Sequence, residues 1–283
     1  MHGITRKAVG ALGVLGIVSL AVVASAFARP DGSAAVAAPN VDCDNARIGF
    51  MGPITGDAAF IGKEQLGFAK YAVRKLGKGN ITLVEGDTQL DPAQASTVGA
   101  RFHADSNMVA VVGPAGSQEV LAVAPIFKKS ARLPFISGSA TATALTNGSI
   151  PSFFRVVPND SVQSPTIARY IRITLKAKSV FIVDDQTAYS RPLANGVQAN
   201  LRAGGVKIER TSVNQKVTDF SALVSRIDDD ADVVFLPWQI AANAQIFGQQ
   251  MKEQGKDAII FGSDGLDSGD FKIQGSFVSA FAP

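Results

Sequence analysis

Residues 108–127 read MVAVVGPAGSQEVLAVAPIF, and this stretch carries the pattern that decides the fold. Its apolar start, Met108–Val112, has the composition of a buried β-strand. A loop that contains glycine and proline, Gly113–Ser117, follows this strand, and the chain then takes on helical periodicity near residues 118–130. A strand, a glycine-containing loop and a helix in this order are typical of parallel α/β sheets.

The same alternation runs along the chain from Arg47 onward. The runs that favour strands span residues 47–51, 81–86, 108–112, 134–137, 180–184, 206–209, 232–236 and 258–261. The stretches that favour helices lie near residues 60–76, 92–105, 118–130, 161–176, 190–203, 220–229 and 241–254. Asp91 and Asp219 precede two of these stretches as expected helix caps. We therefore predict an α/β protein with two Rossmann-like lobes, each built on a parallel sheet.

Residues 1–28 have the pattern of a secretory signal peptide, because basic residues precede an uncharged run that ends in small residues. Cleavage is expected after Ala26 or Ala28. An uncleaved anchor is the alternative, since the run is about long enough to cross a bilayer. Residues 29–44 are rich in alanine without periodicity, which predicts a flexible tether. The folded part is thus expected in the periplasm or at the extracellular face of the membrane.

The segment 149–160, SIPSFFRVVPND, has two prolines around an apolar strand and is interpreted as the first crossing between the lobes, a hinge. The first lobe is then expected within residues 45–157 and the second within residues 158–264. Residues 275–281 look like the start of another strand, after which the chain ends abruptly without a closing helix.

Composition excludes several kinds of function. The net charge is +3, and the basic residues are not clustered with aromatics, so nucleic-acid binding is not expected. Beyond the signal, His103 and Cys43 are the only histidine and cysteine, so we expect no metal site and no cofactor. A GxxxxGK[ST] phosphate loop is absent, and no catalytic cluster argues for an enzyme. Cys43 is expected to pair with a cysteine beyond Pro283, with lipidation as the weaker alternative.

Two loops follow predicted strands of the first lobe at their carboxyl ends, where open parallel sheets bind ligands. They contain Ser117, Ser139 and Thr141. Hydroxyls and free N–H groups at helix starts form a donor cluster suited to a carboxylate. The alternative is that these residues only cap the helices that follow.

The second lobe offers a carboxylate and two aromatics at strand ends. Asp264 lies between glycines in Gly262–Gly265, where it could pair with a ligand cation, although Asp beside Gly is also a common turn former. Tyr189 and Trp238 follow two other predicted strands, with core packing as their alternative role.

Taken together, these motifs resemble the periplasmic binding proteins for leucine, isoleucine and valine, which have the type I binding-protein fold with two lobes and a hinge. The resemblance runs from about Arg47 to Pro283. It implies that residues 265–283 start a return to the first lobe and that further residues complete that lobe, so we expect a C-terminally truncated chain with exposed apolar sheet surface. The residues that carry it are Ile48–Gly56, Asp91–Ala95, Ala110–Gly113, Ile136–Thr141, Asp219–Leu223 and Gly262–Gly265.

This resemblance implies that Ser117, Ser139 and Thr141 hold a ligand carboxylate and that Asp264 holds its ammonium group. It also implies that Tyr189, Trp238 and Phe60 are aromatics bordering the ligand. Two departures stand out. Leu90 and Gly116 occupy positions that a disulfide joins in some members, and Asp264 stands where a glutamate is usual.

The expected function is therefore that of a monomeric extracytoplasmic solute-binding protein of an ABC importer. Its ligand is expected to be an amino acid, branched-chain or similar, delivered to a membrane permease. The alternatives are a sensor domain of the same fold, a binder of amides, urea or aromatic acids, and a non-functional truncated product.

Overall fold

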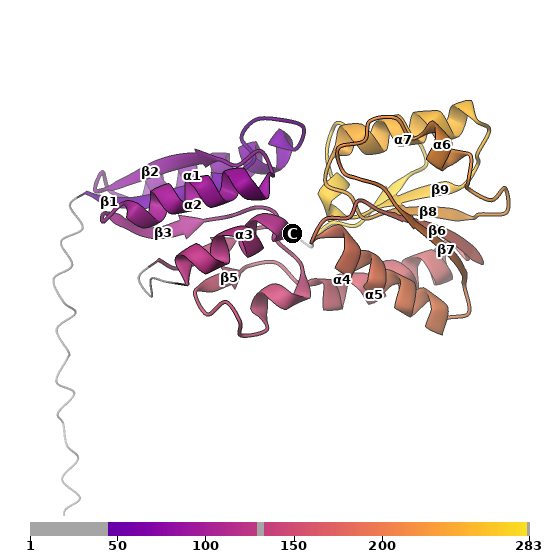
Figure 1. The fold of residues 1–283 in the computed structure, drawn as a ribbon, viewed down its shortest axis with the longest axis horizontal. Helices are drawn as coiled ribbons and strands as arrows, with labels where there is room; N and C mark the ends of the chain where they lie inside the picture. Colours follow the sequence, from indigo (N-terminus) through magenta and orange to yellow (C-terminus); the bar gives the residue numbers. More distant parts are fainter. Residues whose placement is uncertain (1–44, 129–132, 282–283) are drawn as a thin grey trace, which may run out of the picture. The chain divides into compact units, whose positions relative to one another are not determined.

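The structure is a computed structural model that describes residues 45–128 and 133–281. The expected signal peptide and the whole of the expected tether, including Cys43, lie outside the described residues. Within these ranges the chain forms two parallel sheets with helices packed against them, as Figure 1 shows. This confirms the expected α/β class with two Rossmann-like lobes.

The sheet of the first lobe has the strand order β2-β1-β3-β4-β5, and every pairing between neighbours is parallel. Its strands are β1 (Ala46–Gly52), β2 (Ile81–Asp87), β3 (Met108–Val112), β4 (Phe135–Ser137) and β5 (Phe153–Arg155). The helices of this lobe are α1 (Ala59–Leu76), α2 (Pro92–Ala104) and α3 (Ser117–Phe127), with a short 3-10 helix at Thr143–Thr146. β5 comes from the segment that was expected to cross between the lobes.

The sheet of the second lobe has the order β10-β9-β8-β6-β7, again with parallel pairings. Its strands are β6 (Ser179–Asp184), β7 (Lys207–Ser212), β8 (Val233–Leu236), β9 (Ile259–Gly262) and β10 (Phe277–Val278). The helices are α4 (Asp160–Arg169), α5 (Ser190–Ala203), α6 (Ser221–Val224) and α7 (Ala241–Glu253). A π-helix at Tyr170–Thr174 continues α4, and a 3-10 helix at Asp264–Leu266 follows β9.

Alternate side chains of the first sheet pack into different cores. Met51 and Val111 join the core under α2 and α3, whereas Phe50 joins Leu66 and Ala69 on the side of α1. Phe50 and Met51 are both buried, but in cores on opposite faces of the sheet. This is the two-residue period expected of a strand that is covered on both faces.

The predicted start of α2 is confirmed, whereas the helix expected after Asp219 is shorter than predicted. Asp91 caps α2, because its Oδ1 accepts hydrogen bonds from Ala93 N and Gln94 N at 2.8 and 3.0 Å. The helix expected at residues 220–229 is reduced to the single turn of α6. Asp219 accepts from Ser221 N at 3.0 Å, yet three consecutive aspartates at 228–230 favour a turn over a helix. Lys207 pairs with two of these aspartates.

The expected boundary at residue 264 does not mark the end of the second sheet. Phe277 and Val278 pair with Phe261 and Gly262 of β9, so this part of the segment 265–283 belongs to the second lobe. Phe277 also stacks on Phe261 with ring centroids 6.3 Å apart. A return to the first lobe therefore does not begin before Val278.

Part of the first sheet presents apolar side chains to solvent. Val112, Ile136 and Phe154 are register partners across β3, β4 and β5. Ile136 and Phe154 are 38% and 52% exposed, and Phe68 of α1 is 69% exposed. This surface borders the cavity described below.

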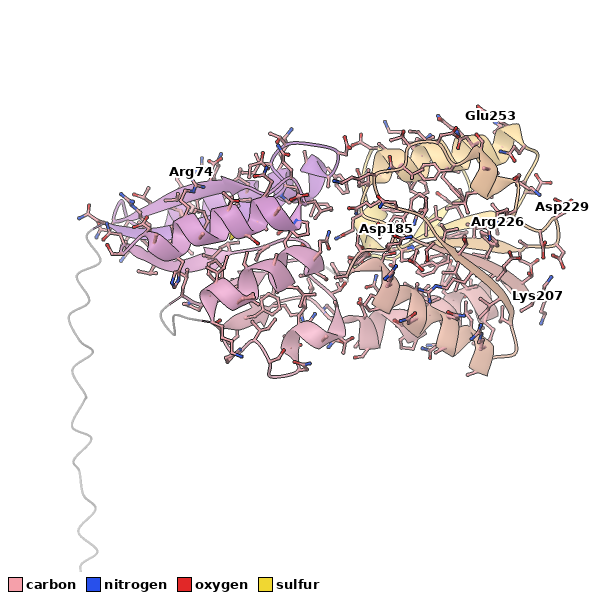
Figure 2. The ribbon with its side chains drawn as sticks, in the orientation of Figure 1. Arg74, Asp185, Lys207, Arg226, Asp229 and Glu253 are labelled. Atoms are coloured by element: carbon pink, nitrogen blue, oxygen red, sulfur yellow. The ribbon has the colours of Figure 1, made fainter. Side chains whose placement is uncertain are left out.

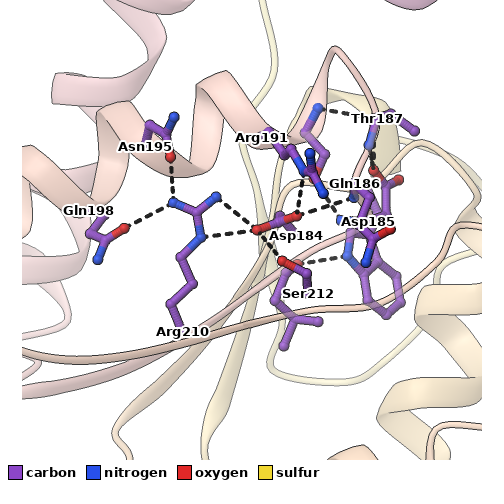
Figure 3. A network of polar contacts seen from close by, with 12 residues as sticks. Asp184, Asp185, Gln186, Thr187, Arg191, Asn195, Gln198, Arg210 and Ser212 are labelled. Carbon is purple, nitrogen blue, oxygen red and sulfur yellow. Dashed lines mark hydrogen bonds and ion pairs between the residues drawn. The ribbon is translucent and has the colours of Figure 1, made fainter.

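A polar network stabilises the carboxyl end of β6, as Figure 3 shows. The buried carboxylate of Asp184 accepts hydrogen bonds from Arg210 Nε and Nη2 at 3.0 and 2.7 Å, and from Ser212 Oγ at 2.9 Å. Arg210 in turn donates to Asn195 and Gln198 of α5. The network thus links β6, β7 and α5, and it replaces the water that Asp184 loses on burial.

Replacing Arg210 by methionine should destabilise the protein by about 3 kcal/mol, because it leaves the Asp184 carboxylate buried without its main cation. Urea unfolding followed by circular dichroism measures this change. Arg74→Met is the matched control: Arg74 is an exposed cation of α1 (Figure 2), and its loss should leave the midpoint unchanged. Equal effects of the two substitutions would show that the buried pair does not stabilise the fold.

Candidate functional site

The loop after β3 places Ser117 at the start of α3 but turns its side chain into the protein. Ser117 is fully buried, and its Oγ accepts a hydrogen bond from Ala142 N at 3.2 Å. The cap position of α3 is Gly116, whose N–H donates to Glu119 Oε2 at 2.6 Å. Ser117 therefore ties the loop after β3 to the loop after β4.

The loop after β4 is stabilised by its own hydroxyls. Ser137 Oγ accepts hydrogen bonds from Ser139 N and Ala140 N at 3.3 and 2.9 Å. Ser139 Oγ donates to Ala115 O at 2.8 Å and accepts from Gln65 Nε2 at 2.9 Å. Some of the donors expected to face a ligand are thus already used within the protein.

Thr141 is the residue of this loop that keeps unused hydrogen-bonding capacity. Its hydroxyl is buried and has no partner among the described residues. Its carbonyl accepts from Asp160 N at 3.0 Å, which joins the loop to the first residue of α4. The guanidinium of Arg155 holds the loop by donating to the carbonyls of Ala140 and Ala142, both at 3.0 Å.

Asp264 lies where β9 ends, and donors from two other segments converge on it. Its Oδ1 lies 2.6 Å from the hydroxyl of Tyr189 and 2.5 Å from Nε2 of Gln163 on α4. Tyr189 also lies within hydrogen-bond distance of Ser263 Oγ, at 2.7 Å. Burial raises the pKa of Asp264, while the Tyr189 and Gln163 hydrogen bonds lower it. Burial and the neighbouring Asp264 raise the pKa of Tyr189, which keeps its hydroxyl protonated as a donor.

Asp160 is a second buried acid that sequence reasoning did not single out. It is 4% exposed, and both of its carboxylate oxygens are without a hydrogen-bond partner among the described residues. Burial raises its pKa to about 7, the charge of Asp264 adds to this, and the nearby Thr141 hydroxyl and Arg155 lower it. Its position at the end of the crossing segment was visible in the sequence, but nothing there indicated its burial.

A cavity of about 560 Å³ is lined by residues of both lobes. This volume is within the range of sites for small molecules. Three of the predicted site residues line it: Phe60, Ser139 and Asp264. Gln65 and Gln239 also line it, and sequence reasoning missed both.

The remaining predicted residues lie behind this wall. Ser117, Thr141 and Tyr189 are buried and do not line the cavity. The Tyr189 hydroxyl hydrogen-bonds to Asp264, which does line it. Trp238 is 2% exposed, donates from Nε1 to Val183 O at 2.7 Å, and packs against Phe220 and Phe247. Trp238 therefore packs in the core, as the alternative to a ligand contact proposed. The next residue, Gln239, lines the cavity instead.

The acidic groups of the wall have no basic counterpart in it. Glu64, Asp264 and Asp267 line the cavity, whereas no lysine, arginine or histidine among the described residues does. Within residues 45–128 and 133–281 no group of three or more histidine, cysteine or acidic side chains could hold a metal. In the same ranges no helix is long and apolar enough to span a membrane.

Comparison with known proteins identifies the family. The family model described as periplasmic binding protein matches residues 45–275, so the chain belongs to this family of solute-binding proteins. The Leu/Ile/Val-binding protein BraC3 of Rhizobium johnstonii is 28% identical over 79% of this chain and 62% of its own length. The chain thus spans less than two thirds of that relative.

Solved structures show the same fold. The branched-chain amino acid transporter substrate-binding protein LivJ of Streptococcus pneumoniae, in complex with isoleucine, has a TM-score of 0.70 and 28% identity over 80% of this chain and 66% of its own. A solute-binding protein of an ABC transporter from R. palustris, in complex with 4-hydroxybenzoate, has a TM-score of 0.70 and 18% identity over 78% of this chain and 62% of its own.

The buried carboxyl of Glu119, beside Ser117, should make stability depend on pH. Burial raises its pKa to about 7, whereas an unfolded chain ionises this group near its ordinary value of about 4.3. Between these two values the unfolded state loses its proton first, so stability falls as pH rises and stays low above pH 7.

Glu119→Gln removes this titration. Its free energy of unfolding relative to the unmodified protein should rise by about 3 kcal/mol between pH 4 and pH 8. Urea unfolding at a series of pH values measures the difference in free energy of unfolding between the two proteins. The raised pKa values of Asp160 and Asp185 affect both proteins equally, so their contributions cancel in this difference. Parallel curves for the two proteins would contradict the assignment.

Proposed function

We propose that this protein is the extracytoplasmic solute-binding protein of an ABC importer and carries an amino acid in the cleft between its lobes. The observation that supports this most is the cavity wall, which brings Asp264 and Ser139 from different lobes to one space. A ligand with both an ammonium and a carboxylate group would interact with both sides.

The acidic side of the cleft suits the ammonium group. Asp264 uses Oδ1 for Tyr189 and Gln163, which fixes the carboxylate, and its neighbour Asp160 is buried without partners. A cation that approached these acids would favour their charged forms. Its binding would therefore lower both pKa values and offset the cost of burial.

The carboxylate group would lie against the loop after β4. Ser139 of this loop lines the cavity, whereas the buried Thr141 hydroxyl lies behind the wall, close to the carboxyl of Asp160. Ser117, which holds this loop through Ala142 N, would then position the donors rather than contact the ligand. This assigns supporting roles to Ser117 and Thr141 and leaves Ser139 as the predicted residue of this loop that faces the ligand.

Aromatic acids are a second class of ligand, because a relative from R. palustris was solved with 4-hydroxybenzoate. Such a ligand brings a carboxylate and no cation. The wall of this cavity holds three acidic and no basic side chains among the described residues, which favours a ligand with an ammonium group.

The first ligands to test are the branched-chain amino acids, alanine and threonine, which appear in the names of relatives. Thermal-shift screening of these, together with amides, urea and 4-hydroxybenzoate, separates the classes, since a ligand stabilises the state that it binds. Stabilisation only by compounds without an ammonium group would refute the amino-acid proposal. Export, delivery to a permease and a monomeric state belong to the same proposal.

Asp264→Asn should weaken amino-acid binding by about 3 kcal/mol, roughly a hundredfold in Kd, because the variant keeps the shape and loses the charge that pairs with the ammonium group. Isothermal titration calorimetry measures the change. Asp270→Asn is the matched control, since Asp270 is an exposed acid six residues further on and does not line the cavity. Unchanged affinity in Asp264→Asn would remove this residue from the site.

A further inference from the structure

Two buried glutamines join the lobes at the cavity. Gln118, in the first turn of α3, donates from Nε2 to Oε1 of Gln239, which follows β8, at 2.9 Å. The two residues are 7% and 5% exposed and stand 121 positions apart in the chain. Gln239 lines the cavity, and Gln118 lies next to Ser117.

The hydrogen bond fixes which end of Gln239 remains available. Its Oε1 is engaged by Gln118, and no described residue accepts a hydrogen bond from its Nε2. A primary amide offers two N–H donors at that nitrogen. Gln239 is thus a nine-tenths buried side chain on the cavity wall with free donors.

Glycine at position 265 leaves the space in which Gln239 lies. A Cβ atom at this position would lie 2.4 Å from Trp238 O and 2.9 Å from Gln239 Cγ. Both distances are too short for any side chain. Gly265 lines the same cavity and directly follows Asp264, so the backbone of the acidic loop and the glutamine occupy one part of the wall.

We propose that Gln239 selects the ligand by donating a hydrogen bond from Nε2 to an oxygen on the ligand's side chain, while Gln118 holds the amide in that orientation. This rests on the proposed function and names its ligand class. The preferred ligands are amino acids with a neutral oxygen-bearing side chain, a hydroxyl or an amide. Branched aliphatic side chains are disfavoured.

The physical reason is the cost of an unpaired buried donor. An aliphatic side chain against Gln239 would remove water from Nε2 and supply no acceptor. Sites built to hydrogen-bond a polar group therefore reject analogues that lack it more strongly than apolar sites discriminate by size. An acidic side chain is disfavoured as well, because Glu64 and Asp267 line the same cavity without a cation.

Two near-isosteric ligand pairs test this proposal: threonine against valine, and asparagine against leucine. Isothermal titration calorimetry gives the four dissociation constants for the unmodified protein. We expect threonine and asparagine each to bind at least tenfold more tightly than the aliphatic partner. Equal affinities within the pairs, or tighter binding of valine and leucine, would overturn the inference while leaving amino-acid binding intact.

Gln239→Met keeps the length of the side chain and removes the donors. It should weaken threonine and asparagine at least tenfold and leave valine and leucine unchanged or tighter. A uniform loss for all four ligands would instead show that Gln239 only supports the closed arrangement, and would also overturn the inference. Gln239→Glu, which keeps the acceptor for Gln118 and lacks Nε2, should show the same loss of preference if the methionine variant does not fold.

Gln118→Met should reduce the preference within each pair without abolishing it, because Gln239 loses its fixed orientation but keeps its donors. Gln249→Met is the matched control, since Gln249 is exposed on α7 and does not line this cavity. It should leave all four constants unchanged. If none of the four amino acids binds the unmodified protein, this inference fails, whereas the proposed function fails only when no amino acid stabilises the protein in the thermal-shift screen.

Discussion

The carboxylate of Asp264 is the point at which three segments of the second lobe meet, and the geometry of the cleft depends on it. Tyr189 precedes α5, Gln163 belongs to α4, and Asp264 follows β9. Parallel strands bring their carboxyl ends to one edge of the sheet, and there the segments that follow β6 and β9 meet past the end of β8, through the Tyr189–Asp264 contact. Because α4 begins at the crossing between the lobes, the Gln163 bond also fixes the crossing to this edge.

The strands were predictable because periodicity is a local signal. The expected strand limits lie within a few residues of those observed, and the capped start of α2 at Asp91 follows from local chemistry alone. The helix expected at 220–229 was not predictable in the same way. Its shortening depends on the turn that Lys207 and Lys256 stabilise through pairs with Asp228, Asp229 and Asp230, and these lysines are distant in sequence.

The site was predictable to the level of its loops, and less so to the level of its side chains. All four residues of β8 are buried, so the strand has no alternation from which to tell which residue after it faces the cavity. Trp238 and Gln239 therefore could not be distinguished from sequence, and the aromatic was chosen. Asp160 was missed for a related reason, because its burial arises from contact with a loop of the other lobe.

Several buried polar atoms of the cleft lack partners among the described residues, including Oγ1 of Thr141, both oxygens of Asp160 and Oε1 of Gln65, Gln118 and Gln163. Each such atom costs about 1–3 kcal/mol relative to a satisfied one. A fold tolerates this cost where other interactions exceed it, and here the bonds from Arg155 to the carbonyls of Ala140 and Ala142 hold the loop that carries Thr141.

Among these residues Gln65 lines the cavity, so a ligand donor that reaches its Oε1 recovers part of this cost, whereas Thr141, Asp160, Gln118 and Gln163 do not line it. A ligand that contacts Gln65 together with Asp264 or Gln239 of the second lobe makes all of these contacts only when residues of both lobes surround it. Affinity for the arrangement in which Gln118 reaches Gln239 then exceeds affinity for an arrangement in which the lobes are apart. Such a difference is what allows a ligand to shift the population toward closure. The polar groups of the cavity wall thus connect the choice of ligand to the arrangement of the two lobes.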